Sequence, residues 1–404
     1  MKLLPGKLRG SLVAHTGWQL GARGYTAAAQ LLAYALVGAI GSDHMMAVYA
    51  VSMAAAGLMG TAVDFGTGLW MVREIAKGGR RPRLEVPRVV MLGLCATALT
   101  AAGLLHVVPI AAVPWIFVSG AVIGCSGLWR GVLWGSKRYD VEATASATQA
   151  TLLIAGLAIL LLGQISIISG PLVVAAVAFG AGYVVRVRWG RRLAEHDPHR
   201  MPFRVWLREV YSYAGQELVV SAQTQLDVLL LGMLWVGPAA GLAAYGLAMR
   251  FYYAIGMPFE SLGTAVLPRV AGHELIAWKK VIRWAVPVGL AALAGMAVLT
   301  SLGTLFGLSS AGADYLRSVG LILLVALPFR FAAYVLGAVV TGSGHQRARL
   351  VSAAIGLTTM VGLDVLLIPL HGPVGAAVAL TCADVALMTG YAAAVRRALR
   401  SVPA

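Results

Sequence analysis

The chain alternates long apolar runs with short polar segments along its whole length. Each run is rich in Ala, Leu, Val and Gly and is about as long as a helix that crosses a bilayer, roughly 20 residues. We predict a membrane-spanning helix for each of twelve such runs. Six lie in the first half, at 16–40, 45–70, 89–109, 111–134, 143–163 and 170–187, and six in the second, at 210–236, 241–266, 284–306, 317–341, 350–370 and 374–395.

The composition favours an integral membrane protein and excludes a soluble catalytic domain. Of the 404 residues, 59% are apolar and 12% are charged, and the mean hydropathy is +0.81. Soluble domains carry roughly 25% charged residues. Because one span with its turn uses roughly 25 to 35 residues, twelve spans leave almost no length for a domain outside the membrane.

The basic residues predict the orientation of the spans. Lys and Arg total 32, and 27 of them fall in the two tails and in alternate loops that the twelve-span map places on one side. The opposite loops hold Arg317, and the other four, Arg23, Arg130, Arg250 and Arg330, fall inside spans. By the positive-inside rule, both termini are expected in the cytoplasm and the protein in the cytoplasmic (inner) membrane. The net charge of +16 is therefore explained by the orientation of the spans, and no nucleic-acid partner is expected.

The longest polar stretch divides the chain into two halves. It runs from Arg186 to Glu209 on the basic side, so it reads as a linker between two six-helix bundles. We therefore expect an N-terminal bundle at 1–187, a cytoplasmic linker at 188–209 and a C-terminal bundle at 210–404.

An internal repeat indicates how the halves are related. With an offset of 196 residues, Tyr49 falls on Tyr245, Asp64 on Glu260 and Arg73 on Arg269. Six spans per half keep both halves in one orientation, so we expect a pseudo-two-fold axis along the membrane normal. Transporters are commonly built this way, with the substrate site near the midplane between the repeats.

Polar side chains form stripes on three predicted helices. The stripe on the first contains Thr16, Gln19, Arg23, Thr26 and Gln30; that on the seventh contains Ser212, Gln216, Gln223 and Asp227, with Glu217 beside it; that on the eighth contains Arg250, Tyr253, Met257, Ser261 and Thr264, with Glu260 at its edge. Side chains three and four residues apart share one face of a helix. These stripes indicate a hydrated lumen.

The charged residues in these spans are candidates for substrate binding and for coupling or gating. An ionised group at the bilayer centre costs at least about 2.5 to 3.5 kcal/mol, so it usually faces a cavity or a partner. We interpret one set as substrate-binding: Arg23, Arg250, Arg330, Gln19, Gln30, Gln216 and Gln223. A second set is interpreted as coupling or gating residues: Asp227, Glu217, Asp64 and Glu260. The alternative is pairing within a bundle, for which Asp364 and Asp384 are further candidates, or snorkelling to an interface.

The arginines favour an anionic substrate. A guanidinium group holds a phosphate or carboxylate through two parallel hydrogen bonds. The sequence contains no metal-ligand, Walker or nucleophile-elbow motif. We therefore expect a transporter that is not an enzyme, holds no metal or cofactor and draws energy, if any, from a proton or sodium gradient.

Several segments resemble one transporter family. The segment VDFGTGLWMVREIA at 63–76 is similar to the end of the second helix of Wzx-type polysaccharide flippases, and 226–250 to their seventh-to-eighth helix passage, followed by Leu-Pro-Arg at 267–269. GSGHQRARL at 342–350 and LLIPLHGPVGAAVAL at 366–380 resemble their C-terminal half. This family belongs to the multidrug, oligosaccharidyl-lipid and polysaccharide (MOP) exporter superfamily, which includes the MATE transporters.

The resemblance implies two six-helix bundles around a V-shaped cavity and transport by alternating access. It implies a polyprenyl-pyrophosphate-linked glycan as substrate, with membrane lipid, a polysaccharide polymerase and glycosyltransferases as partners. Lipid II flippases of the superfamily typically have two more helices, which this chain lacks. Two alternatives remain open: a proton- or sodium-coupled drug antiporter of the same superfamily, and a membrane glycosyltransferase or polymerase, which the short outer loops disfavour.

The charge distribution predicts the topology directly. Reporter fusions after positions 80, 195 and 275 should report the cytoplasm, whereas fusions near 43, 166 and 238 should report the outside, because basic loops stay on the cytoplasmic side. The activities of alkaline phosphatase and green fluorescent protein fusions measure this. One reversed site among the first three would contradict the twelve-span map.

Overall fold

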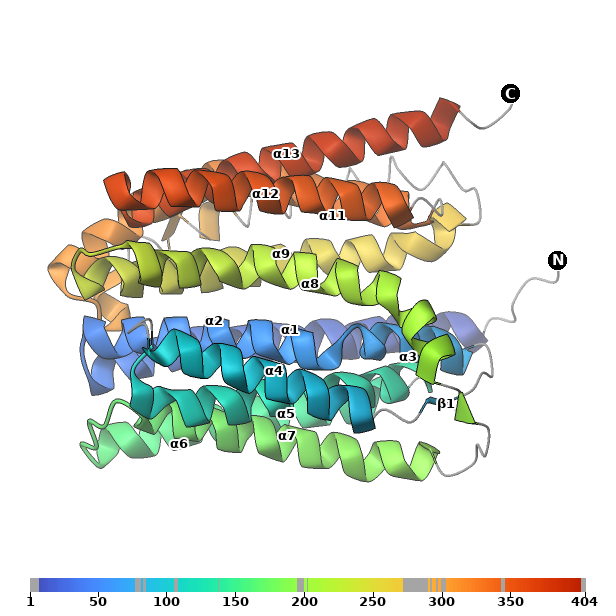
Figure 1. The fold of residues 1–404 in the computed structure, drawn as a ribbon, viewed down its shortest axis with the longest axis horizontal. Coiled ribbons are helices and arrows are strands. Elements are labelled where there is room, and N and C mark those ends of the chain that lie inside the picture. Colours follow the sequence, from blue (N-terminus) through green and yellow to red (C-terminus); the bar gives the residue numbers. More distant parts are fainter. Residues whose placement is uncertain are drawn as a thin grey trace. The chain divides into compact units, whose positions relative to one another are not determined.

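The computed structural model describes twelve ranges of the chain: residues 7–76, 81–82, 85–104, 108–136, 138–194, 200–201, 203–271, 290, 293–295, 297–298, 303–342 and 346–400. These ranges are almost entirely helical (Figure 1). In the first half the helices are α1 (Lys7–Ile40), α2 (Asp43–Asp64), α3 (Thr67–Ala76), α4 (Glu85–Leu104), α5 (Val113–Gly135), α6 (Tyr139–Leu162) and α7 (Gly170–Ala194). In the second half they are α8 (Phe203–Leu234), α9 (Ala239–Ala271), α11 (Ser310–Gly342), α12 (Gln346–His371) and α13 (Pro373–Arg400).

The helices extend beyond the apolar runs that predict them. α7 continues to Ala194 and α8 begins at Phe203, so basic residues assigned to the linker are helical. Between these two helices, a short strand β2 (Arg200–Met201) pairs in parallel with β1 (Arg81–Pro82). Hydropathy finds only the part of a helix that is buried in lipid, whereas backbone hydrogen bonds continue into the polar ends. The predicted span 284–306 lies mostly outside the described residues.

The predicted span 45–70 is two helices rather than one. α2 ends at Asp64, and α3 begins at Thr67. Between them Phe65 and Gly66 have positive φ angles of 49° and 65°, which a right-handed helix cannot accommodate. A Cβ at Gly66 would lie 2.6 Å from the backbone nitrogen of Ala214 in α8. The bend therefore requires a glycine for both its conformation and its packing.

Asp64 stabilises the start of α3 after this bend. Its carboxylate accepts hydrogen bonds from the Thr67 hydroxyl at 3.0 Å and from the Gly68 backbone nitrogen at 3.3 Å. Trp70, which is fully buried in α3, donates its indole N–H to Glu209 of α8 at 3.1 Å. These bonds satisfy the first amides of the short helix and fix it to the neighbouring helix.

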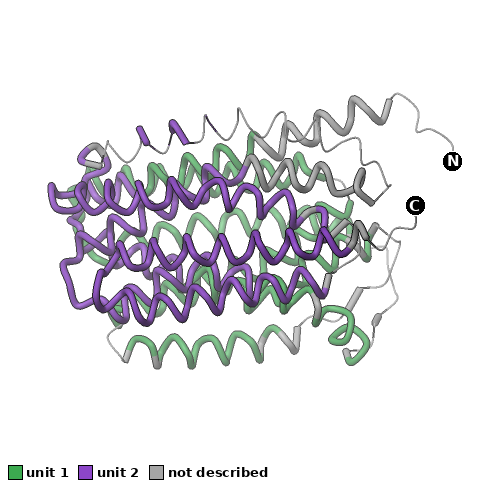
Figure 2. Tube along the Cα trace, turned by 90° about the horizontal axis from the view of Figure 1, so that it is seen from above, with its two compact units in different colours: residues 1–33, 55–218 green, residues 34–54, 219–404 purple. Residues whose placement is uncertain are grey.

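The described residues form two compact units (Figure 2). Unit 1 contains residues 1–33 and 55–218, and unit 2 contains residues 34–54 and 219–404. The last two turns of α1, from Tyr34, and the first half of α2, up to Ala54, thus belong with the C-terminal helices.

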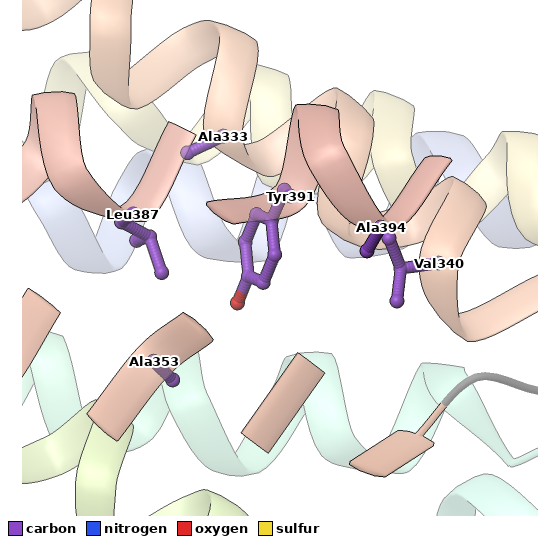
Figure 3. Packing of buried hydrophobic residues seen from close by; sticks show 6 residues of the cluster. All are labelled: Ala333, Val340, Ala353, Leu387, Tyr391 and Ala394. Atoms are coloured by element: carbon purple, nitrogen blue, oxygen red, sulfur yellow. The ribbon is translucent and has the colours of Figure 1, made fainter. Parts of the chain in front are cut away.

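Each unit has its own apolar core. In unit 1, Trp70, Met71, Val132, Trp206 and Val210 form a buried cluster between α3, α5 and α8. In unit 2, small residues let α11, α12 and α13 approach closely around Tyr391; the cluster contains Ala333, Val340, Ala353, Leu387, Tyr391 and Ala394 (Figure 3). Helices in a bilayer associate mainly through such close van der Waals contact, because lipid supplies no hydrophobic driving force between them.

The described helices are suited to a membrane. Within the described ranges, eight helices are long and apolar enough to cross a bilayer, and many large apolar side chains on them point outward, such as Leu162 at 84% exposure and Leu370 at 74%. An apolar surface of this extent is typical of lipid contact. The chain is therefore a multi-pass membrane protein.

Candidate functional site: buried charges in unit 2

Unit 2 collects charged and phenolic side chains from five helices, α8, α9, α11, α12 and α13, with Tyr34 and Tyr49 beside them. They form three groups: one around Arg250, one around Arg330 and one around Asp227. The three groups differ in whether their charges are neutralised.

Arg250 of α9 contacts the phenol group of Tyr34. Its Nε donates to the hydroxyl of Tyr34 at 3.4 Å, and its guanidinium carbon lies 5.8 Å from the centroid of that ring. The Tyr34 ring in turn meets the ring of Tyr49 edge-on at 5.3 Å. None of the ion pairs found within the described ranges includes Arg250. This half-buried guanidinium thus keeps its positive charge, with most of its five N–H donors not used by Tyr34.

Arg330 of α11 is neutralised within the unit. Its Nη2 lies 3.0 Å from Oδ1 of Asp384 in α13, and both side chains are buried. Tyr252 donates its hydroxyl to the other carboxylate oxygen. The rings of Tyr252, Tyr253 and Tyr334 surround the guanidinium at 5.7, 5.7 and 5.9 Å. The pair and its aromatic surroundings therefore join α9, α11 and α13.

Asp227 and Asp364 form an acidic group. Asp227 of α8 is fully buried and accepts hydrogen bonds from the Tyr245 hydroxyl at 2.8 Å and from the Val228 backbone nitrogen at 2.7 Å. Asp364 of α12 is also fully buried and interacts electrostatically with Asp227 and Tyr245. Neither carboxylate oxygen of Asp364 has a hydrogen-bond partner within the described part of the chain. A buried carboxylate in this state needs a proton or a cation.

Gln223, one turn before Asp227, is fixed against α12. It is buried, and its Nε2 donates to the carbonyl of Ala353 at 2.9 Å. Its own backbone carbonyl accepts from Tyr253 at 3.4 Å. The side chain therefore holds α8 against α12, whereas the sequence places it in the substrate-binding set.

The other predicted site residues are distributed between the units. Arg23 and Gln30 lie in unit 1, partly exposed, as do Gln216 and Glu217; Arg23, Gln216 and Glu217 each make an interaction of their own. Asp64 caps α3 in unit 1, as described above. The side chains of Gln19 and Glu260 lie outside the described residues. Within the described ranges, no group of three or more His, Cys, Asp and Glu side chains is placed to hold a metal ion.

The sequence interpretation missed the tyrosines. Four of them contact a charged partner: Tyr34, Tyr245, Tyr252 and Tyr334. From sequence alone, a tyrosine in an apolar run is usually assigned to the membrane interface. A spacing signal was present, because Arg330 and Tyr334 are four residues apart and share a helix face.

Unit 1 contains one buried ion cluster of its own. Arg186 of α7 makes two hydrogen bonds of 2.8 Å to Glu142 of α6, and Arg130 of α5 makes a third at 3.2 Å to the same carboxylate. Arg186 and Glu142 are buried, whereas the side chain of Arg130 is 41% exposed. The cluster joins α5, α6 and α7, and it explains how Arg130 is accommodated within a span.

Comparison with known proteins identifies solved structures that share this architecture. No protein-family model and no curated protein matches the sequence. Among solved structures, a multidrug resistance MATE family transporter of the MOP superfamily in its inward-facing conformation is similar over 93% of this chain and 95% of its own, with a TM-score of 0.70 and 15% identity. The lipid II flippase MurJ in an inward closed conformation is similar over 95% of this chain and 87% of its own, with a TM-score of 0.67 and 12% identity.

A third structure, of the Vibrio cholerae MATE transporter VcmN, covers 98% of both chains with a TM-score of 0.63 and 15% identity. At these identities the likeness establishes the fold. The chain has the two-bundle, all-α fold shared by MATE and MurJ transporters, which confirms the fold class predicted from the sequence.

The buried Arg330–Asp384 pair should contribute to the stability of the protein. Asp384→Asn should lower the free energy of unfolding by about 3 to 5 kcal/mol, because it leaves a buried guanidinium without its carboxylate. Thermal unfolding of the purified protein in detergent measures this. Asp314→Asn, an exposed position on α11, is the matched control and should change stability by less than about 0.5 kcal/mol.

A double variant tests the pairing itself. Arg330→Met with Asp384→Leu removes both charges and should regain most of the stability that Asp384→Asn loses. Equal losses in the single and double variants would contradict the assignment of this pair to a structural role.

Proposed function

We propose that the protein is a flippase that moves a polyprenyl-pyrophosphate-linked oligosaccharide across the cytoplasmic membrane by alternating access, for the synthesis of a surface polysaccharide. The single observation that carries this proposal is the guanidinium of Arg250, which has no ion-pair partner among the described residues of its membrane-spanning unit. A cation retained inside a membrane protein is costly unless its function uses the charge. The fold supports the proposal, since one of its neighbours is a lipid II flippase.

A pyrophosphate fits what Arg250 offers. Its planar fork can make two parallel hydrogen bonds to phosphate oxygens, and such charge-assisted bonds are about twice as strong as neutral ones. Tyr34 fixes the guanidinium on one side and adds little competing negative charge. Arg330 is assigned the structural role of holding Asp384, so the anion-binding role in unit 2 falls to Arg250. Arg23, Gln19, Gln30 and Gln216 of unit 1 stay predictions from the sequence.

The acidic group is proposed as the coupling site. Asp227 and Asp364 together can take up a proton or a sodium ion, and the hydroxyl of Tyr245 already orients Asp227. This observation also favours the second candidate function, a proton- or sodium-coupled antiporter of small molecules. Glu217 and Glu260 stay in the proposal as gating residues, and Asp64 contributes to gating by fixing the bend between α2 and α3.

The setting follows from the same proposal. We place the protein in the inner membrane with both termini in the cytoplasm, as a transporter without enzymatic activity or bound cofactor. Its partners are the lipid-linked glycan, membrane lipid and the glycosyltransferases and polymerase of the same polysaccharide. Genes for such enzymes beside this one would support the flippase, whereas a drug-responsive regulator beside it would favour the antiporter.

The first experiment replaces Arg250. Arg250→Ala should reduce flipping about ten- to a hundredfold, since hydrogen bonds to charged groups contribute about 1.5 to 3 kcal/mol. Arg250→Lys keeps the charge without the fork and should lose less. The measurement is translocation of a polyprenyl-pyrophosphate-linked glycan in proteoliposomes, normalised to the amount of protein. Arg317→Ala, at an exposed arginine on α11, is the matched control.

Two results would overturn the role of Arg250. One is full activity of a well-expressed Arg250→Ala variant. The other is poor folding of that variant with recovery when Asp227 is also replaced by Asn, which would make the arginine a structural partner of the acid. Normal flipping of the glycan lipid combined with loss of drug export would assign Arg250 to the antiporter.

The second experiment tests coupling. Asp364→Asn and Asp227→Asn should abolish stimulation of transport by an imposed sodium or proton gradient, because an amide takes up neither ion. Exchange of substrate with equal ion concentrations on both sides should persist. Proteoliposomes with each gradient imposed separately measure both quantities, with Asp314→Asn as control. Unchanged gradient stimulation in both variants would exclude this pair as the coupling site.

A further inference from the structure

An exposed cluster of arginines surrounds a tryptophan at the C-terminal end of α7 in unit 1. The guanidinium carbons of Arg138 and Arg192 both lie 5.2 Å from the ring centroid of Trp189. Arg188 and Arg191 are exposed on either side of that tryptophan in the chain. We call these four arginines and Trp189 the α7 cluster. It is separate from the groups around Arg250, Arg330 and Asp227, which lie in unit 2.

The α7 cluster carries an excess of positive charge. Asp140 neutralises Arg138 through hydrogen bonds of 3.0 and 2.9 Å. No ion pair to Arg188, Arg191 or Arg192 is found within the part of the chain that the structure describes. Three exposed guanidinium groups therefore remain within two turns of one helix, where their mutual repulsion favours a bound anion.

The same helix presents an apolar face that leads to the cluster. Val177 and Val184 are both 62% exposed and lie seven residues apart, on one side of α7. Arg188 and Arg191 follow Val184 at four and seven residues, so they continue this side. A face that is apolar and exposed along a membrane helix contacts lipid tails, and the arginines at its end lie where the headgroups begin.

From this arrangement we infer that the α7 cluster binds the phosphate headgroup of an acidic phospholipid from the surrounding bilayer. The acyl chains would lie along the valine face, Arg188 and Arg191 would hold the phosphate, and Trp189 would lie at the interface with Arg138 and Arg192 against its ring. Net charge distinguishes the two kinds of lipid, because an acidic headgroup brings a negative charge to the three arginines, whereas a zwitterionic headgroup brings no net charge. Each basic residue near a surface adds about 1 kcal/mol of attraction to anionic lipid.

The test is native mass spectrometry of the full-length protein in detergent, titrated with dioleoylphosphatidylglycerol or dioleoylphosphatidylcholine. The unmodified protein should retain phosphatidylglycerol in preference to phosphatidylcholine. Replacing Arg188, Arg191 and Arg192 together by Gln should weaken phosphatidylglycerol binding at least tenfold, and Trp189→Leu should weaken it more than Trp189→Phe. Arg396→Gln with Arg397→Gln, at two exposed arginines on α13, is the control and should retain the preference.

Thermal unfolding without added lipid separates binding from folding. The triple variant should melt as the unmodified protein does, since its three side chains are exposed, and should lose only the stabilisation that added phosphatidylglycerol gives. Equal retention of the two lipids, or an equal loss in the α13 control, would overturn the inference. So would displacement of phosphatidylglycerol by undecaprenyl pyrophosphate at equal concentration, which would identify the cluster as a substrate site instead.

Discussion

The free-energy cost of a charge within the bilayer determines how unit 2 is organised. Arg330, Asp384 and three tyrosine rings offset much of this cost, because the pair is neutral and surrounded by polarisable groups. The helices α9, α11 and α13 that carry these residues are thereby fixed to one another. Arg250 and Asp364 lie in the same unit without an equivalent partner among the described residues. This difference separates the charges that hold the fold from those that are available for function.

Unit 1 follows the same rule with fewer functional candidates. Glu142 is buried and compensated twice, by Arg186 and by Arg130, and the surplus charge is located on the exposed Arg130. Asp64 is used as a helix cap beside two residues with positive φ. The Trp70–Glu209 hydrogen bond then ties the short helix α3 to α8.

The sequence predicted the fold well and the site only in part. Ten of the twelve predicted spans each match one described helix, with ends that differ by at most nine residues, because lipid burial and apolar composition are directly linked. Hydropathy missed the break at Phe65 and Gly66, since a change of φ leaves the apolar run continuous. It could not decide which intramembrane charges pair. Arg330 and Asp384 lie on different helices, and their contact depends on how α11 and α13 are rotated about their axes, which a single sequence does not determine.

Arg250 and the acidic pair of Asp227 and Asp364 carry opposite charges within one unit. Opposite charges attract each other more strongly in a medium of low dielectric constant than in water. An anion bound to Arg250 would cancel this effect, so the Asp227–Asp364 pair would hold a cation more tightly. Linkage makes the effect reciprocal, because a cation on the acids would raise the affinity of Arg250 for an anion by the same factor. Within the proposed function, substrate and coupling ion therefore favour each other's binding in unit 2, without any further moving part.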